Sequence, residues 1–302
     1  FYNALLSDVA HSSRYGAASG WGIFANYFGQ ITGLLITLPL ATGAITLWGE
    51  PGRAQTLIPS AIIFFILALP MIIFFKEEAQ KESATINIAQ EYKDAFGSFK
   101  HLISIPGLGV FFLAYFLFSD ALITASNNFP IYLEKVFSIS DSIKTYLLIL
   151  IMAASAVGAV VGGWATDKVG HKKSLITVLA GWVITYALMI VSTNFTLFFI
   201  FSGLMGLWFG AIWTVTRAVV TKLTPPDVLN RSFTYYTLME RFATFVGPIT
   251  WGLIVAVPFE SPSTAYKLAA ASMCAFVAAG LVIAKRLPSD KPAATVDKLI
   301  SA

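Results

Sequence analysis

GGWATDKVGHKK, residues 162–173, gathers one aspartate, three lysines and one histidine in a chain that is 57% hydrophobic and only 12% charged. The stretch lies between two long apolar runs, at approximately 143–166 and 172–192. A short charged turn between apolar runs of this length either marks a membrane surface or forms a functional site. The composition and charge pattern of the remaining chain bear on both possibilities.

The chain as a whole is far more apolar than a soluble domain of its size. It has 302 residues, 25 of them Phe, and a mean hydropathy of +0.74. A membrane-spanning helix needs about 20 predominantly apolar residues. We therefore predict an all-α, polytopic membrane helical bundle with eight spans, at approximately 21–48, 55–75, 106–128, 143–166, 172–192, 195–222, 234–257 and 264–285.

Basic residues divide the predicted loops into two unequal sets. Cytoplasmic loops carry the excess of Lys and Arg, so both ends of this chain are predicted to be cytoplasmic. The net charge of +4 is then a topology signal, and we expect no nucleic-acid partner. The predicted location is the plasma (inner) membrane, or a vacuolar-type membrane in a eukaryote. The basic-rich set comprises Arg14, Lys76, Lys81, Lys93, Lys100, Lys168, Lys172, Lys173, Lys222, Arg231, Lys285, Arg286, Lys291 and Lys298, against Arg53, Lys135, Lys144 and Lys267 in the other.

Sequence motifs of common enzymes are missing from the chain. It contains no HExxH, no Walker GxxxxGK[ST] and no Gly-x-Ser-x-Gly, and its three histidines lie outside the predicted spans. Cys274 is the single cysteine, so the sequence contains no disulfide framework and no cysteine metal site. We therefore expect no enzyme activity, no cofactor and no bound metal.

The one long predicted loop, 76–105, begins with charged residues and then repeats apolar residues at helical spacing. This pattern predicts an amphipathic helix on the cytoplasmic surface, and the alternative is a flexible linker with chance periodicity. The repeating residues are Ala89, Tyr92, Phe96, Phe99 and Ile103.

The opening stretch resembles the loop signature of the major facilitator superfamily. The match is Gly163-x-x-x-Asp167-Lys168-x-Gly170-His171-Lys172-Lys173, with His171 where that family usually has Arg. Glycine at 163 permits close helix approach, glycine at 170 permits a tight turn, and Asp167 is suited to a helix N-terminus. In the alternative interpretation, these basic residues only enforce orientation.

The resemblance implies a domain organisation, because that family places its signature between the second and third helices of each six-helix half. Residues 106–286 then form a complete C-terminal half, and 1–75 contain the last two transmembrane helices of the preceding half. The segment 76–105 becomes the inter-half linker, and 287–302 a cytoplasmic tail. Eight of an expected twelve spans would be present, with four preceding them.

A narrower resemblance, to the family of the autophagy-linked vacuolar amino-acid effluxer and its bacterial relatives, is spread along the chain. It implies a permease that moves a small-molecule substrate, such as an amino acid, by alternating access, coupled to a proton or cation. The alternative is a non-transporting receptor or scaffold on the same fold. The matching pieces are FYNALL (1–6), FFLAYFLFSDAL (111–122), the signature, TRAVVTKLTP (216–225) and ERFATFVGP (240–248), with departures at 119–121 and 216–218.

Four ionisable residues lie well inside predicted spans: Asp120, Arg217, Glu240 and Arg241. A charge in hydrocarbon costs at least about 2.5–3.5 kcal/mol, so such residues are candidates for function. We expect Arg217 to pair with Glu240, or to reach the headgroups as Arg241 also could. Arg241 matches a basic residue of the resembled family and would face a cavity or the preceding half.

Asp120 has no basic residue at its depth within the predicted spans. It is predicted to bind a coupling proton or cation, or to pair with a base in preceding helices. Asn26 and Gln30 share one helix face and line a cavity or bond to other helices. Gly247-Pro248 is predicted to kink its helix.

The family's pseudo-symmetry implies one further contact. Asp167 should meet the N-terminal end of the helix that begins near Trp21, and so hold the outward-facing state.

Overall fold

The computed structural model describes residues 6, 10–74 and 97–289. Its contacts divide the chain into two units. The first unit contains Phe1–Ala25 and Ala95–Ala302, and the second contains Asn26–Asp94. Helix α2 (Tyr15–Ala41) begins in the first unit and continues in the second, which also contains η2 (Arg53–Thr56) and α3 (Leu57–Phe74).

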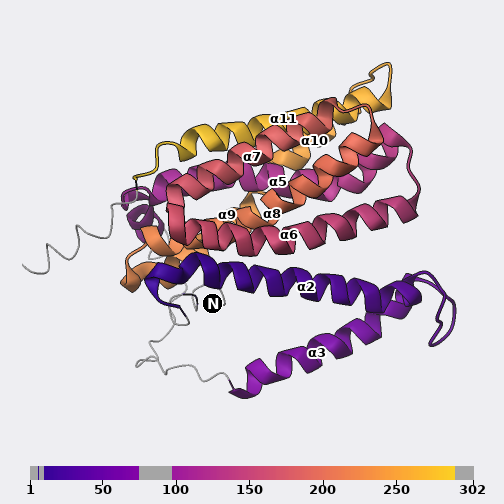
Figure 1. The fold of residues 1–302 in the computed structure, drawn as a ribbon, viewed down its shortest axis with the longest axis horizontal. Helices are drawn as coiled ribbons and strands as arrows, with labels where there is room; N and C mark the ends of the chain where they lie inside the picture. The colour runs from indigo at the N-terminus through magenta and orange to yellow at the C-terminus, as the bar shows by residue number, and fades with distance from the viewer. Residues whose placement is uncertain (1–5, 7–9, 75–96, 290–302) are drawn as a thin grey trace, which may run out of the picture. The chain divides into compact units, whose positions relative to one another are not determined.

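The first unit is a helical bundle in which α5, α6, α7, α8 and α11 run roughly along one direction (Figure 1). Counting α9 and α10 as one, eight helical segments in the described part are long and apolar enough to cross a membrane. The eight predicted spans are therefore confirmed. The unit's elements are η1 (Ser12–Arg14), the start of α2, α5 (Leu108–Phe137), α6 (Asp141–Val169), α7 (His171–Val191), α8 (Phe195–Leu223), η3 (Pro226–Val228), α9 (Leu229–Phe242), α10 (Val246–Ala256) and α11 (Pro262–Ala284).

Several predicted boundaries were wrong. Helix α2 begins at Tyr15 rather than 21 and ends at Ala41 rather than 48, where Gly43 takes a positive φ of 76° and ends the helix. Helix α5 continues to Phe137 rather than 128, through Pro130 and the charged Glu134 and Lys135. The predicted span 234–257 is two helices instead of one kinked helix.

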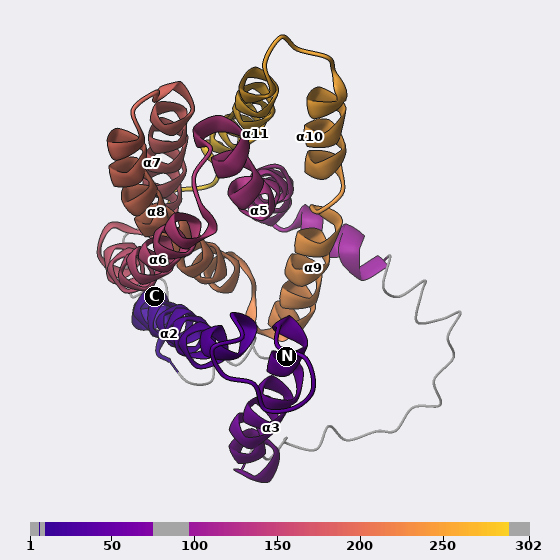
Figure 2. The same cartoon turned by 90° about the vertical axis from the view of Figure 1, so that its right-hand side faces the viewer.

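The break in that span lies before the predicted kink site. Helix α9 ends at Phe242 and α10 begins at Val246, so Gly247 and Pro248 belong to the first turn of a new helix. Proline is tolerated there because the first N–H groups of a helix have no partner within it. Figure 2 shows α9 and α10 as two separate helical segments joined by a short connection.

Glycines allow α6 and α8 to pack backbone to backbone. A Cβ on Gly158 would meet Leu207 O, and one on Gly162 would lie 2.7 Å from the Ala211 Cβ. The Ser155 hydroxyl also donates to Gly206 O across this interface, at 2.9 Å. Small residues at such spacing are typical of close helix pairs in membranes.

Helix α5 passes through the core of the first unit and packs extensively against α11. Its Phe111, Tyr115 and Phe118 are all fully buried. Of the predicted amphipathic segment, residues 76–96 lie outside the described part, and residues 97–104 are helical. Phe99 packs on Tyr235 of α9 with ring centroids 5.2 Å apart, whereas Ile103 is exposed. The predicted domain boundaries at 76, 106 and 287 stay predictions.

Candidate functional site

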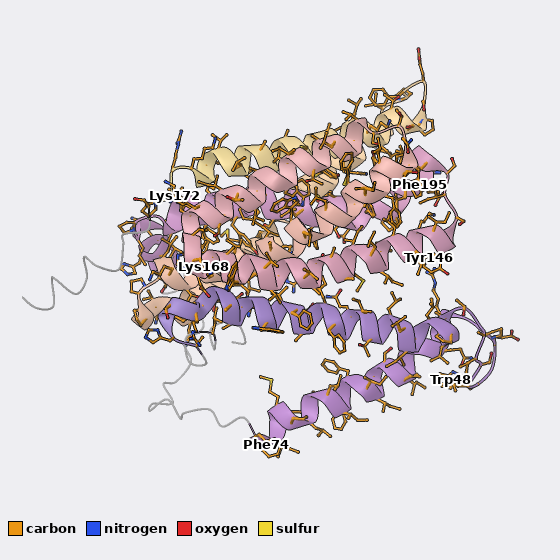
Figure 3. All side chains as sticks on the ribbon, in the orientation of Figure 1. Trp48, Phe74, Tyr146, Lys168, Lys172 and Phe195 are labelled. Carbon is orange, nitrogen blue, oxygen red and sulfur yellow. The ribbon has the colours of Figure 1, made fainter. Side chains whose placement is uncertain are left out.

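The charged signature forms the turn between α6 and α7. Gly170 is the single residue between the two helices, and its φ of 93° and ψ of 160° suit glycine rather than a residue with a Cβ. Lys168 and Lys172 lie at one end of the bundle, whereas Tyr146 and Phe195 lie at the other (Figure 3). The signature residues are therefore gathered at the end predicted to be cytoplasmic.

Asp167 binds the start of helix α2 with both carboxylate oxygens. Its Oδ1 accepts a hydrogen bond from the Gly16 N–H and its Oδ2 one from the Ala17 N–H, each 2.8 Å long. Both donors lie in the first turn of α2, which contains no acidic residue of its own. Such a cap is typically worth about 0.5–2 kcal/mol, and the positive end of the helix dipole favours the anion. This is the contact expected from the sequence, and a gating role for it stays a prediction.

Two glycines make that contact possible. Gly16 of α2 and Gly163 of α6 lie so close that a Cβ on either would meet the carbonyl oxygen of the other. One turn further along α2, a Cβ on Gly20 would lie 2.6 Å from Ala159 O. The Ser19 hydroxyl donates to Thr214 O of α8 at 3.1 Å. The first turns of α2 are therefore held by α6 and α8 through backbone groups.

The signature lysines make different contacts. The Lys168 ammonium lies 3.7 Å from the centre of the Trp164 ring, a cation–π arrangement one turn apart on α6. Lys172 donates to Leu287 O at 2.5 Å, just beyond the C-terminus of α11, where a cation is favourable. His171 is half-buried and Lys173 is exposed.

Asp120 lies in α5 and is only 2% exposed. Its Oδ2 accepts a hydrogen bond of 2.6 Å from the Gly247 N–H in the first turn of α10. The sequence was searched for a basic residue at the depth of Asp120, whereas the partner in the structure is a backbone amide. Its other oxygen, Oδ1, is buried without a hydrogen bond, as is the hydroxyl of Thr124 one turn away.

A tyrosine cluster joins α5, α8 and α9 on the α9 side of the break. The rings of Tyr115 and Tyr236 are stacked with centroids 4.4 Å apart. Tyr115 donates to Glu240 Oε2 at 3.2 Å, and the hydroxyls of Tyr236 and Thr216 are 3.0 Å apart. Arg217, 7% exposed, directly follows Thr216 on α8. The structure thus brings both predicted residues to one cluster, and their direct pairing stays a prediction.

The other candidate residues lie on exposed faces. Arg241 is exposed in the last turn of α9, and its place facing a cavity or the preceding half stays a prediction. In the second unit, Asn26 and Gln30 are exposed on α2, and Gln30 donates to the Asn26 side-chain oxygen. The shared face predicted for this pair is present.

A comparison with family models identifies the protein family of this chain. The model of the Major Facilitator Superfamily matches residues 111–300, which is more than half of the chain. The chain belongs to the major facilitator superfamily. It is therefore an integral, multi-pass membrane protein of a transporter family rather than of an enzyme family.

Relatives within the superfamily are distant. The uncharacterised MFS-type transporter YxiO of Bacillus subtilis is 24% identical over 89% of this chain and 63% of its own length. An uncharacterised protein of Aquifex aeolicus is 26% identical over 85% of this chain and 61% of its own. Autophagy-related protein 22 of Cryptococcus neoformans is 27% identical over 51% of this chain and 31% of its own. Both resemblances drawn from the sequence are confirmed, and the chain spans 61–63% of the first two relatives.

Sequence reasoning missed four functional candidates in this superfamily member. The Gly16-x-x-x-Gly20 spacing at the start of α2 is a small-residue pattern that could have been found. Tyr115, Tyr236 and Thr124 gave no signal, because a tyrosine or threonine in an apolar helix is compatible with ordinary packing. Their relation to Glu240 and Asp120 exists only in the folded chain.

Proposed function

We propose that this chain is part of a secondary active transporter that moves a small solute across a membrane by alternating access. The single observation that carries the proposal is the capping of α2 by Asp167 of the family signature. Membership of the superfamily supports the general function. Amino acids are the first substrate candidates, because the chain resembles the amino-acid effluxer family and aligns with autophagy-related protein 22.

The Asp167 contact is suited to a reversible bond between two halves of a transporter. In the proposed architecture α2 belongs to the N-terminal half, and α6 to the C-terminal half. Rocking of the halves would separate the carboxylate from the Gly16 and Ala17 amides. This separation costs little free energy, because water can then bond to both the carboxylate and the amides. An interaction of 1–2 kcal/mol present in one state alone shifts a two-state equilibrium by a factor of about 5–30.

Asp120 is the candidate coupling residue in this proposal. It is a buried carboxylate about 18 Å along α5 from Leu108, at 1.5 Å per residue, and it faces a broken helix. Transporters of this type place coupling sites at discontinuous helices near the middle of the membrane. Arg217, Glu240 and Arg241 are proposed to lie along the cytoplasmic part of the substrate pathway, with Asn26 and Gln30 in the preceding half.

The test is transport by the protein made from its full reading frame and reconstituted in liposomes. Radiolabelled neutral, acidic and basic amino-acid pools would be supplied with and without an imposed proton gradient. We expect uptake of at least one pool above that of protein-free liposomes, with stimulation by the gradient. Absence of transport for every pool and every gradient, by protein that is folded in the vesicles, would favour the receptor or scaffold alternative.

A further inference from the structure

The first turn of α10 has no capping side chain from the residue that precedes it, and its hydrogen-bond acceptor is a buried carboxylate on another helix. Phe245 precedes the helix and provides no side-chain hydrogen bond, and Pro248 has no N–H. Ile249 N–H donates weakly to Phe245 O, at 3.4 Å. Gly247 is buried in this turn, and its N–H donates to the Asp120 carboxylate of another helix at 2.6 Å.

Two oxygen atoms beside this bond have no hydrogen-bond partner among the residues that the structure describes. Asp120 Oδ1 and Thr124 Oγ1 are both buried and unsatisfied, in residues that are 2% and 0% exposed. Both lie against Gly247, because a Cβ built there would meet the Thr124 hydroxyl and would lie 2.8 Å from Asp120 Oδ1. A buried carboxylate oxygen without a donor can take up a proton, and the protonated group is then a donor for a nearby hydroxyl oxygen.

We propose that Asp120 is a proton-binding site: its ionised form holds the start of α10, and its protonated form, with the proton on Oδ1 donated to the nearby Thr124 Oγ1, releases it. Ionised Asp120 provides a full negative charge to the positive end of the α10 dipole. A proton on Oδ1 removes that charge and leaves Oδ2 a neutral, weaker acceptor for the Gly247 N–H. Proton uptake thus loosens the break between α9 and α10.

A metal cation fits the same place poorly. Calcium and magnesium ions in proteins are bound by six or more oxygen ligands, and the side chains of the described residues present two unsatisfied buried oxygen atoms here.

In the described part of the chain, the hydrogen bond that Asp120 accepts comes from a backbone amide. In the described part of the chain, Asp120 makes its hydrogen bond to Gly247, and the recorded salt bridges both involve Glu134. Titratable side chains on α5 itself and on the helices packed against it are Tyr115, Tyr132, Glu134 and Lys135 on α5, Arg217 and Lys222 on α8, Arg231, Tyr235, Tyr236, Glu240 and Arg241 on α9, and Tyr266, Lys267 and Cys274 on α11.

The inference rests on the proposed function only in placing this proton site in a transport cycle, so its test does not use transport. The full-length protein in lipid nanodiscs would be studied by hydrogen exchange at neutral and acidic pH, with exchange rates corrected for the pH dependence of the chemistry. The readout is opening of the backbone at residues 243–252. We expect acidification to raise opening there by roughly 2- to 30-fold, the range for a charge at a helix end.

The variants separate this site from other acids. Asp120→Asn keeps an acceptor for Gly247 but cannot ionise, so its opening should be high and independent of pH. Glu134→Gln, the same change at an exposed position of α5, should behave like the parent protein. Thr124→Val keeps the carboxylate and removes the second oxygen, so the midpoint should move to lower pH. Infrared difference spectra should show a protonated carboxyl band that Asp120→Asn removes.

Several results would overturn the proposal. These are a parent protein without pH-dependent opening, an Asp120→Asn variant that keeps it, an unchanged midpoint in Thr124→Val, or opening that follows sodium at constant pH. If opening follows Asp120 but the protein transports nothing, the proposed function fails and the proton site stands. If transport is proton-driven but backbone opening at residues 243–252 does not depend on Asp120, the proposed proton site is wrong and the proposed function stands.

Discussion

Gly16 and Gly163 pack backbone against backbone, so that a methyl group on either would meet the carbonyl oxygen of the other. This closeness brings the Asp167 carboxylate within 2.8 Å of two amides at the start of α2. The signature glycine and the signature aspartate therefore serve one contact, the glycine by allowing approach and the aspartate by binding the helix end.

Substituting Gly163→Ala should separate α6 from α2 and destabilise the protein. Overpacking of this kind costs typically about 1–3 kcal/mol, and the Asp167 bonds should weaken with it. Gly29→Ala is the matched control on α2, since a Cβ there meets nothing within 4 Å. Thermal unfolding in detergent measures both. Equal melting temperatures for the two variants would contradict the close packing.

Removing the charge at the signature should shift the conformational equilibrium without removing the substrate site. Asp167→Asn keeps the side-chain shape but loses the charged acceptor of two hydrogen bonds, so we expect a change of about 5- to 30-fold in the ratio of the two states. Spin-label distances across the halves of the full-length protein measure this ratio. Loss of substrate binding with unchanged distances would contradict the gating role.

Asp120→Asn should abolish proton-driven transport, because the coupling carboxylate can no longer exchange a proton. Protein that remains folded and membrane-inserted should still bind substrate. Counterflow, which needs no proton gradient, should persist while gradient-driven uptake is lost. Glu134→Gln is the control for the chemical change. Gradient-driven uptake that survives in Asp120→Asn would remove this residue from the coupling site.

Charge reversal tests the predicted pairing of Arg217 with Glu240. Arg217→Glu and Glu240→Arg should each impair transport, and the double variant should recover part of the loss, with a coupling of about 0.5–3 kcal/mol between the sites. Both singles also disturb the tyrosine cluster, so expression and melting temperature are measured in parallel. A double variant no better than either single would show that the two residues do not form a pair.

Gly247→Ala should destabilise the start of α10, because its methyl group would be placed against Thr124 and Asp120. We expect a loss of about 1–3 kcal/mol in stability. On the same helix, Gly252→Ala meets nothing within 4 Å and should be neutral or slightly stabilising, since alanine favours helices. A comparison of their melting temperatures decides the point, and a harmless Gly247→Ala would argue against the tight site.

Much of the architecture follows from local sequence, because bilayer length and apolar composition are properties of each segment by itself. The eight spans, the tight turn at Gly170 and the place of the signature could all be predicted in this way. Helix ends were harder, as the start of α2 at Tyr15 shows. Extending a helix by a polar or half-polar turn past its apolar run costs little free energy. Hydropathy therefore does not mark the residue at which the helix begins or ends.

The sequence by itself determined that Asp120 and Asp167 are carboxylates in or beside membrane-spanning helices. It also indicated that such charges need a binding partner to offset their cost in free energy. Only the tertiary structure decided what they bind. Both accept hydrogen bonds from backbone amides at helix starts far away in the chain. Every residue except proline has such an amide, so no side-chain pattern identifies the donor. The donor becomes identifiable when the packing of glycines brings a helix end and a carboxylate together.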